Sequence, residues 1–319
     1  MKISSFSSLF KSKAKEAGWL AVGVSHDGIY LAQVLFDGAM PRVVRCEFHG
    51  TPDRVTVADL EHLKREARLE NVICTTLLSP GEYQMMLVDA PNVPANELKR
   101  AVRWKIKDGL NYHIDDATVD VLLIPPNKSR SDRGQTLYAI AAPNELIQKR
   151  IALFEQAKLP LSVIDIVETA QRNIAALFEK KDRALGLLAF DEYGGLLTFT
   201  FAGELYLSRR IEITVGQLMD ADEDLREQSR SRVELELQRS LDYFDRQFHH
   251  LSLSGILLSA PREFGLAEFL DESVDISVTQ LDLSGVMDIS AVPALAESAY
   301  MVQVLPVLGA ALRQETRVL

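Results

Sequence analysis

Two short stretches of the sequence combine an acidic residue with glycine between apolar runs. Residues 21–34 read AVGVSHDGIYLAQV, with Asp27-Gly28 in the polar centre, and residues 189–198 read AFDEYGGLLT, with Asp191 ahead of Gly194-Gly195. An Asp-Gly pair between apolar runs is typical of a tight β-hairpin, because glycine accepts the positive φ of such turns. A glycine-containing loop can also hold phosphate groups through its backbone amides. Two interpretations are therefore open, a plain hairpin or a phosphate-binding loop.

The cysteines and histidines form no recognisable metal-binding or hydrolase motif. Cys46 and Cys74 lie far apart and outside any Cys/His cluster, so we expect two reduced, buried thiols. The side chains of His249 and His250 would diverge by about 100° on a helix and could not share one metal. No Ser/His/Asp or Cys/His arrangement is present. We predict neither metal ligands nor catalytic residues.

The elements that would position these stretches alternate between strands and helices. Hairpins predicted over 19–35 and 185–201 open the two halves of the chain. Between them, residues 83–156 read strand, helix, strand, strand, helix, which indicates a small α/β subdomain. An amphipathic helix is predicted over 235–251, a strand over 274–278 and a helix over 294–313. This order is typical of a duplicated α/β fold with an insertion.

Length and composition indicate a globular protein with more than one core. The chain has 319 residues, 47% of them hydrophobic, and a formal net charge of -10, so we expect no nucleic-acid binding. No apolar run approaches the roughly 20 residues that span a bilayer. Residues 1–18, with Phe6, Leu9 and Phe10 among Ser and Lys, lack signal-peptide features. They fit either a solvated leader or a weak interfacial anchor. We expect a cytoplasmic protein.

Five stretches carry a resemblance to a known family. They read LAVGVSHDGIYLAQV (20–34), MLVDAPNVPANELKRAVRWKIKDGLNYHIDDATVDVLLI (86–124), VIDIVETAQRNIAAL (163–177), VELELQRSLDYFDRQF (233–248) and VLPVLGAALR (304–313). In this order they resemble the PilM-like family of type IV pilus assembly, and within it the branch of mannose-sensitive pilus biogenesis. That family belongs to the actin-like ATPase superfamily.

The resemblance implies the fold class and the domain organisation. The expected fold is α/β, an actin-like (ribonuclease H-like) two-lobed fold with an inserted small α/β subdomain. The expected parts are a flexible leader (1–18), a first actin-like lobe (19–80), the inserted subdomain (81–157), a helix returning to the first lobe (158–183), a second actin-like lobe (184–293) and a closing C-terminal helix (294–319).

The first phosphate loop of the superfamily resembles residues 21–34 in shape but differs in its chemistry. An actin-like ATPase uses a loop of the pattern D-x-G-S-x-S-x-K, whose acidic residue helps to position Mg²⁺. In the matching positions this sequence has Gly23 for the Asp, Ser25 for the glycine and Tyr30 for the lysine. The resemblance therefore implies a hairpin without phosphate ligands, in which Asp27 and Gly28 are the remaining candidates.

The other nucleotide-binding elements are also altered. The second loop has Ala189 in place of an Asp, although a slide of two residues would restore Asp191 with Gly194 and Gly195 close behind. A later Gly-Gly turn is replaced by Ala260-Pro261, and proline lacks an N–H.

The late helix keeps Glu236 and Arg239. In relatives this helix lines the adenosine pocket, so these two residues are either a remnant of that pocket or an ordinary i,i+3 ion pair.

These differences predict a pseudo-ATPase with a degenerate, empty nucleotide site. The candidate residues of that site are Asp27, Gly28, Asp191, Gly194, Gly195, Glu236 and Arg239. The alternative is a PilM-type protein that still binds ATP with Mg²⁺. A sugar-kinase-like enzyme of the same superfamily would need the missing phosphate loops as well, and would need a catalytic Asp.

The resemblance further implies a non-catalytic adaptor at the inner-membrane face. Its partner would be a PilN/MshJ-like membrane protein, bound through its cytoplasmic N-terminal peptide in a cleft between subdomain and first lobe. The candidate lining residues are Trp104, Leu110, Tyr112 and Tyr138, although Trp104 and Leu110 fit equally well as subdomain core. The pilus assembly ATPase is a second candidate partner, and membrane association would be indirect.

Overall fold

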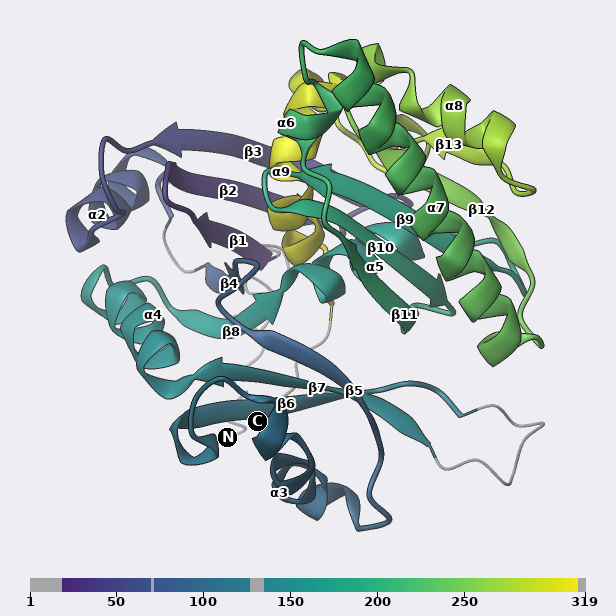
Figure 1. Ribbon diagram of the computed structural model, residues 1–319. Helices are drawn as coiled ribbons and strands as arrows, with labels where there is room; N and C mark the ends of the chain where they lie inside the picture. Colours follow the sequence, from purple (N-terminus) through teal and green to yellow (C-terminus); the bar gives the residue numbers. More distant parts are fainter. Residues whose placement is uncertain (1–18, 70–71, 127–134, 315–319) are drawn as a thin grey trace, which may run out of the picture.

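The computed structural model describes residues 19–69, 72–126 and 135–314 and contains three β-sheets (Figure 1). The leader predicted over 1–18 lies outside the described residues. Two of the sheets have five strands each, and the third has three strands.

The first sheet is built around the N-terminal hairpin. Its order is β3-β2-β1-β4-β8, in which β1, β2 and β3 are antiparallel and β4 and β8 run parallel to β1. Buried side chains of the sheet, such as Leu20 and Val22, pack against α2 and α4, which cover one face. The elements are β1 (Trp19–Val24), β2 (Gly28–Leu35), β3 (Arg42–Gly50), α2 (Val57–Glu66), β4 (Ile73–Leu78), α4 (Asn144–Gln156) and β8 (Leu161–Ile166).

The second sheet repeats this topology. Its order is β11-β10-β9-β12-β13, again with three antiparallel strands followed by two parallel ones. Helices α7 and α8 cover its outer face, and Phe244 of α7 stacks on Phe199 of β10. The elements are β9 (Ala184–Asp191), β10 (Gly194–Phe201), β11 (Glu204–Ile211), α6 (Val215–Leu218), α7 (Glu223–Phe248), β12 (Leu253–Ser259), α8 (Leu266–Ser273) and β13 (Val278–Gln280).

Two apolar helices, α5 (Val167–Ala176) and α9 (Ser298–Ala311), lie between the two large sheets. They contact each other so closely that a side chain at Gly309 would clash with the backbone of Ala170. Most side chains of both helices are buried, and they form one core with residues of both sheets. This shared core joins the two halves of the molecule.

The third sheet belongs to the inserted subdomain. Its order is β5-β7-β6, all antiparallel, and α3 covers one face through Leu98, Val102 and Ile106 at helical spacing. The opposite face of the same sheet is turned toward β11, so each strand contributes alternate residues to two different surroundings. The elements are β5 (Gln84–Asp89), α3 (Ala95–Ile106), β6 (Ala117–Leu123) and β7 (Thr136–Pro143).

Three predicted boundaries were wrong. Helix α7 begins at Glu223 instead of 235, because the Asp222 side chain caps the helix there. The first half of the helix is charged and exposed. The strand expected over 274–278 is β13, which begins only at Val278, because Val274 is still the C-terminal cap of α8. Helix α9 begins at Ser298, after a 3₁₀ turn over Pro293–Ala296. Other 3₁₀ turns are Lys107–Gly109, Ile114–Asp116, Arg262–Phe264 and Leu283–Gly285.

Candidate functional site

The first hairpin turn contains Asp27 and Gly28, and its glycine is explained by the neighbouring strand. Gly28 begins β2 with φ at 155°, and a Cβ there would lie 2.3 Å from the carbonyl oxygen of His49 on β3. Asp27 accepts a hydrogen bond from the hydroxyl of Tyr30 at 3.1 Å. Burial, followed by the Asp27 charge, raises the pKa of Tyr30. The turn is therefore stabilised by contacts within the sheet.

The second hairpin turn has the same construction. Gly194 has φ at 126°, and a Cβ there would lie 2.7 Å from the carbonyl oxygen of Ile211 on β11. A Cβ on Gly195 would lie 2.7 Å from the ring of Phe190. In both hairpins, the close approach of the next strand or of a core ring requires glycine.

Asp191 lies at the end of β9 and is largely enclosed. Its carboxylate accepts a hydrogen bond from the amide of Tyr193 at 2.8 Å, and burial raises its pKa. The adjacent cavity, which Gln171 and Pro306 also line, has a volume of about 20 Å³. That volume holds about one water molecule, not a phosphate group.

The tips of the two hairpins contact each other across the lobes. The His26 ring of the first tip lies 3.7 Å from the Glu192 carboxylate of the second tip. In this conformation the two side chains lie in the space between the tips.

Glu236 and Arg239 form an ion pair with each other on the exposed side of α7. The Arg239 guanidinium donates to the Glu236 carboxylate at 2.7 Å, and both side chains are solvent-accessible. This arrangement matches the ordinary i,i+3 pair that the sequence left open.

The turn after β12 places Pro261 and Gly265 at the two ends of a 3₁₀ turn. Gly265, which has φ at 57°, directly precedes α8 as its N-terminal capping residue.

The structure does not bring the four predicted peptide-binding residues together. Trp104 is 69% exposed on α3, so it is not part of the subdomain core. Leu110 packs against that core, and Tyr112 is half-buried beyond the end of α3. Tyr138 lies on the opposite face of the sheet, because Leu137 and Ala139 on either side of it point toward α3.

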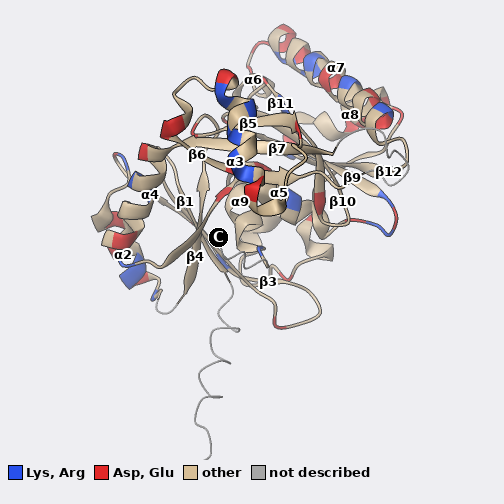
Figure 2. Ribbon diagram, turned by 90° about the horizontal axis from the view of Figure 1, so that it is seen from below, with Lys and Arg blue, Asp and Glu red and all other residues tan. Residues whose placement is uncertain are grey.

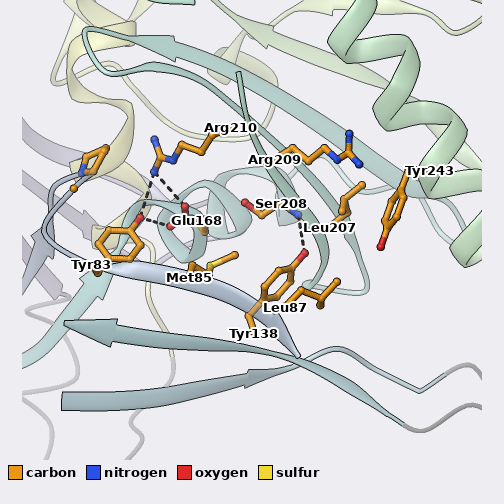
Figure 3. Close-up of a pocket in the computed structure, with 12 residues that line it drawn as sticks. Tyr83, Met85, Leu87, Tyr138, Glu168, Leu207, Ser208, Arg209, Arg210 and Tyr243 are labelled. Carbon is orange, nitrogen blue, oxygen red and sulfur yellow. Dashed lines mark hydrogen bonds and ion pairs between the residues drawn. The ribbon is translucent and has the colours of Figure 1, made fainter. Parts of the chain in front are cut away.

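Tyr138 instead lines a cavity of about 460 Å³ between the subdomain and the second sheet, which we call the junction cavity (Figure 3). A volume of this size is typical of ligand sites. Met85, Leu87 and Tyr138 project from the subdomain side, and residues of β11 face them from the other side. The remaining lining residues are Pro80, Gly81, Tyr83, Glu168, Leu207, Ser208, Arg209, Arg210 and Tyr243.

The free edge of β11 faces this cavity. β11 is the outermost strand of its sheet, so every second backbone amide points away from β10. The amide of Ser208 is one of these, and it donates to the hydroxyl oxygen of Tyr138 at 3.0 Å. Burial raises the pKa of Tyr138 to about 12, which keeps this hydroxyl neutral. An extended chain could pair with β11 here in place of Tyr138.

A buried polar network closes one end of the cavity. Glu168, on the first turn of α5, is buried and accepts hydrogen bonds from the Tyr83 hydroxyl and, at 3.1 Å, from the Arg210 guanidinium. Burial and the Glu168 charge raise the pKa of Tyr83 well above its ordinary value. These three residues come from the subdomain, the central helix and the second sheet, so they join three parts of the molecule.

The other end of the cavity carries an available cation. The guanidinium of Arg209 lies 5.0 Å from the ring centroid of Tyr243 and forms no ion pair with any carboxylate in the described ranges. It can donate to a carbonyl, amide or carboxylate oxygen of a ligand.

Sequence reasoning missed Tyr83, Leu87, Glu168, Arg209 and Arg210. The one available signal was Glu168, an acidic residue inside the apolar stretch IDIVETA.

The part of the chain that the structure describes contains neither a metal-binding cluster nor a membrane-spanning helix. No group of three or more His, Cys, Asp or Glu side chains there is arranged to hold a metal ion. No helix among those residues combines the length and apolar composition needed to cross a membrane.

Sequence comparison finds no matching family model and no matching curated protein. Structural comparison finds similar folds. A structure described as the PilM-PilN type IV pilus biogenesis complex matches with a TM-score of 0.70 and 18% identity, over 92% of this chain and 99% of that chain.

Two weaker structural matches have TM-scores of 0.44. The cytoplasmic domain of EpsL, an inner-membrane component of the type II secretion system of Vibrio cholerae, is 9% identical over 77% of this chain and 83% of that chain. A Bacteroides thetaiotaomicron protein with an actin-like ATPase fold is 10% identical over 95% and 99%.

The likeness to the PilM structure and the sheet topology confirm the predicted fold class: the chain has an actin-like α/β fold with two five-stranded mixed sheets and a small antiparallel sheet.

Proposed function

We propose that this protein is a PilM-like adaptor of a type IV pilus assembly platform, which captures the cytoplasmic N-terminal peptide of a PilN-like inner-membrane protein. The observation that carries the proposal is the junction cavity, where a free strand edge faces an apolar surface. Strand addition combined with side-chain pockets is a common way to bind an extended peptide. The likeness to the structure of a PilM-PilN complex supports the same choice.

In this proposal the peptide pairs with β11 and lays apolar side chains on Met85 and Leu87. Leu87 is 46% exposed and is available for such a contact. Arg209 donates to an oxygen of the peptide, and the peptide backbone replaces Tyr138 as the partner of the Ser208 amide. The finer proposal is that the chain is MshI of mannose-sensitive pilus biogenesis, with an MshJ-like protein as its partner.

The same proposal includes a degenerate nucleotide site that binds no nucleotide. Three observations support it: the glycines of both hairpins are explained by neighbouring strands or rings, the cavity at Asp191 holds about one water, and the two tips contact each other. The positions of the missing ligands, Gly23 and Tyr30, face each other in the β1–β2 ladder. The Tyr30 ring packs against the ring of Phe48 in a tilted arrangement, and it supplies no cation where the superfamily has lysine.

Peptide capture is tested by fluorescence anisotropy with labelled synthetic N-terminal peptides of PilN-like and MshJ-like proteins. Leu87→Glu puts a charge on the apolar surface and should weaken binding at least tenfold, about 1.4 kcal/mol. Trp104→Ser is the matched control, an exposed apolar residue of the same subdomain outside the cavity, and should leave Kd unchanged. A loss with Trp104→Ser alone would move the site to the α3 side. If no peptide binds, the adaptor function is wrong.

The nucleotide proposal is tested by the thermal midpoint in the presence of ATP and Mg²⁺. A ligand present at one hundred times its Kd adds about 2.7 kcal/mol of stability, so binding would be visible. We expect no shift at millimolar ATP. A Mg²⁺-dependent shift would instead favour the PilM-type protein with retained nucleotide binding, and Asp191→Asn would then be the first variant to examine.

A further inference from the structure

The outer face of α3 presents a tryptophan between two available cations. Trp104 is the most exposed large hydrophobic side chain in the described ranges. Arg100 lies one turn before it and Lys107 one turn after it, a spacing that places all three on one side of the helix. The Lys107 ammonium lies 5.8 Å from the indole centroid. We call these three residues the α3 face.

The α3 face lies on the side of the helix that is turned away from the subdomain core. The opposite side of the helix packs on the subdomain sheet, and the remaining cations of α3 have other partners. Lys99 pairs with Asp120 at 3.0 Å, Arg103 donates to the carbonyl of Ala117, and Lys105 donates to that of Asp89.

Arg100 and Lys107 form no ion pair within the part of the chain that the structure describes. The acidic neighbours of the α3 face are Glu97 and Asp108, one toward each end of the helical segment.

This face contrasts with the charge of the whole chain. The net charge is -10, which opposes approach to any anionic surface, while α3 carries a concentration of Lys and Arg (Figure 2). A nucleic acid would meet the repulsion of the whole molecule along its length. A flat anionic surface can be approached by one end of the molecule alone. An indole with flanking cations is the combination that lies at the headgroup level of a bilayer.

We propose that the α3 face contacts the anionic headgroups of a phospholipid membrane. Trp104 inserts its ring at the level of the headgroups, while Arg100 and Lys107 bind lipid phosphates. This contact is separate from the junction cavity, since α3 and that cavity lie on opposite faces of the subdomain sheet. It therefore holds or fails independently of the proposed peptide capture, and it would make membrane association partly direct.

The test is co-sedimentation of the full-length protein with phosphatidylcholine vesicles, with and without phosphatidylglycerol. The wild type should bind the acidic vesicles more strongly, and the preference should fall as salt is raised. Each cation near an anionic surface contributes roughly fivefold, so Arg100→Gln with Lys107→Gln should lower the partition coefficient roughly 30-fold. Adding Trp104→Ser should lower it further.

A matched control comes from other parts of the surface. Arg232→Gln and Leu235→Ser on α7, combined with Lys181→Gln, remove two exposed cations and one exposed apolar side chain from outside α3. This variant should bind acidic vesicles like the wild type, which would separate the α3 face from total charge. Thermal midpoints of all variants should match the wild type, because every substituted side chain is exposed.

Tryptophan fluorescence gives an independent readout. The chain has two tryptophans, Trp19 and Trp104, and only Trp104 is highly exposed. Acidic vesicles should shift the emission to the blue and protect it from iodide, and Trp104→Ser should abolish both effects. The proposal is overturned if the wild type shows no preference for acidic vesicles. It is also overturned if the α3 variant binds like the wild type, since the contact would then lie elsewhere in the chain.

Discussion

Glu168 is a buried carboxylate, and its two hydrogen-bond partners come from other parts of the fold. Tyr83 and Arg210 both donate to it, and the guanidinium also lies 3.3 Å from the tyrosine hydroxyl. A buried charge is costly unless it is paired and hydrogen-bonded. One buried hydrogen-bond network therefore links the subdomain, helix α5 and the second sheet.

Tyr83→Phe should lower the free energy of unfolding by about 2 kcal/mol, because it removes a hydrogen bond to a charged, buried group. Tyr112→Phe removes the equivalent hydroxyl at a position where it is buried and has no hydrogen-bond partner among the described residues, so it should be close to neutral. Urea denaturation of the two variants measures the difference. Equal losses would mean that the network at Glu168 does not stabilise the fold.

Asp191→Asn should stabilise the protein near neutral pH. Burial raises the pKa of Asp191, partly offset by its hydrogen bond to Tyr193 and by Arg210, so the folded chain binds this proton more tightly than the unfolded chain. The stability from this group is fully present below the unfolded pKa, about 3.9, and is lost as pH rises through the folded pKa. Asparagine keeps the hydrogen-bond acceptor and cannot ionise.

Thermal midpoints across pH check this prediction. The advantage of Asp191→Asn should shrink as pH falls toward about 4, where the wild-type carboxyl is also neutral. A variant that is less stable than the wild type at neutral pH would mean that the charge is needed, as a cation site would require.

At the scale of elements, the two hairpins are shaped by the strands beside them. Gly28→Ala and Gly194→Ala should each lower the free energy of unfolding by about 2–3 kcal/mol, because the new methyl group meets a backbone carbonyl. Gly38→Ala is the control, since a Cβ there would lie 3.9 Å from its nearest neighbour, the carbonyl oxygen of Met40. Chemical denaturation gives the values. If the hairpin variants were as stable as the control, the glycines would need an explanation other than packing.

The sequence predicted most elements, because local periodicity determines them. The apolar positions Leu98, Val102 and Ile106 predicted α3 and its buried side, and the Asp-Gly turn predicted the first hairpin. The start of α7 was missed, because residues 223–234 pack few apolar side chains and show little periodicity. A charged, capped helix segment carries a weak signal in a sequence.

The candidate site could not be predicted in the same way. Tyr138 was selected from its residue type, and its neighbours in space, Leu87 and Arg209, lie on strands that no local pattern brings together. Trp104 was selected for the same reason and points to solvent. Long-range packing decides which face of the subdomain sheet meets the second sheet. A single sequence does not reveal that packing.

At the scale of the whole molecule, peptide capture should be visible as protection of β11. A peptide strand would pair with the outward amides of this edge, so hydrogen–deuterium exchange of residues 204–211 should slow on binding. The opposite edge strand of the same sheet, β13, is the internal control and should exchange at an unchanged rate. Slowing at β13 as well, or no slowing at β11, would contradict strand addition.

The two hairpin tips contact each other through side chains of the chain itself, His26 with Glu192. A nucleotide in that position would be hydrolysed and replaced repeatedly, so the conformation of the protein would depend on the supply of ATP. A bridge of side chains has no such cycle. Under the proposed function, the lifetime of the complex is then set by the abundance and dissociation rate of the partner peptide, and assembly at this point would continue in a cell depleted of ATP.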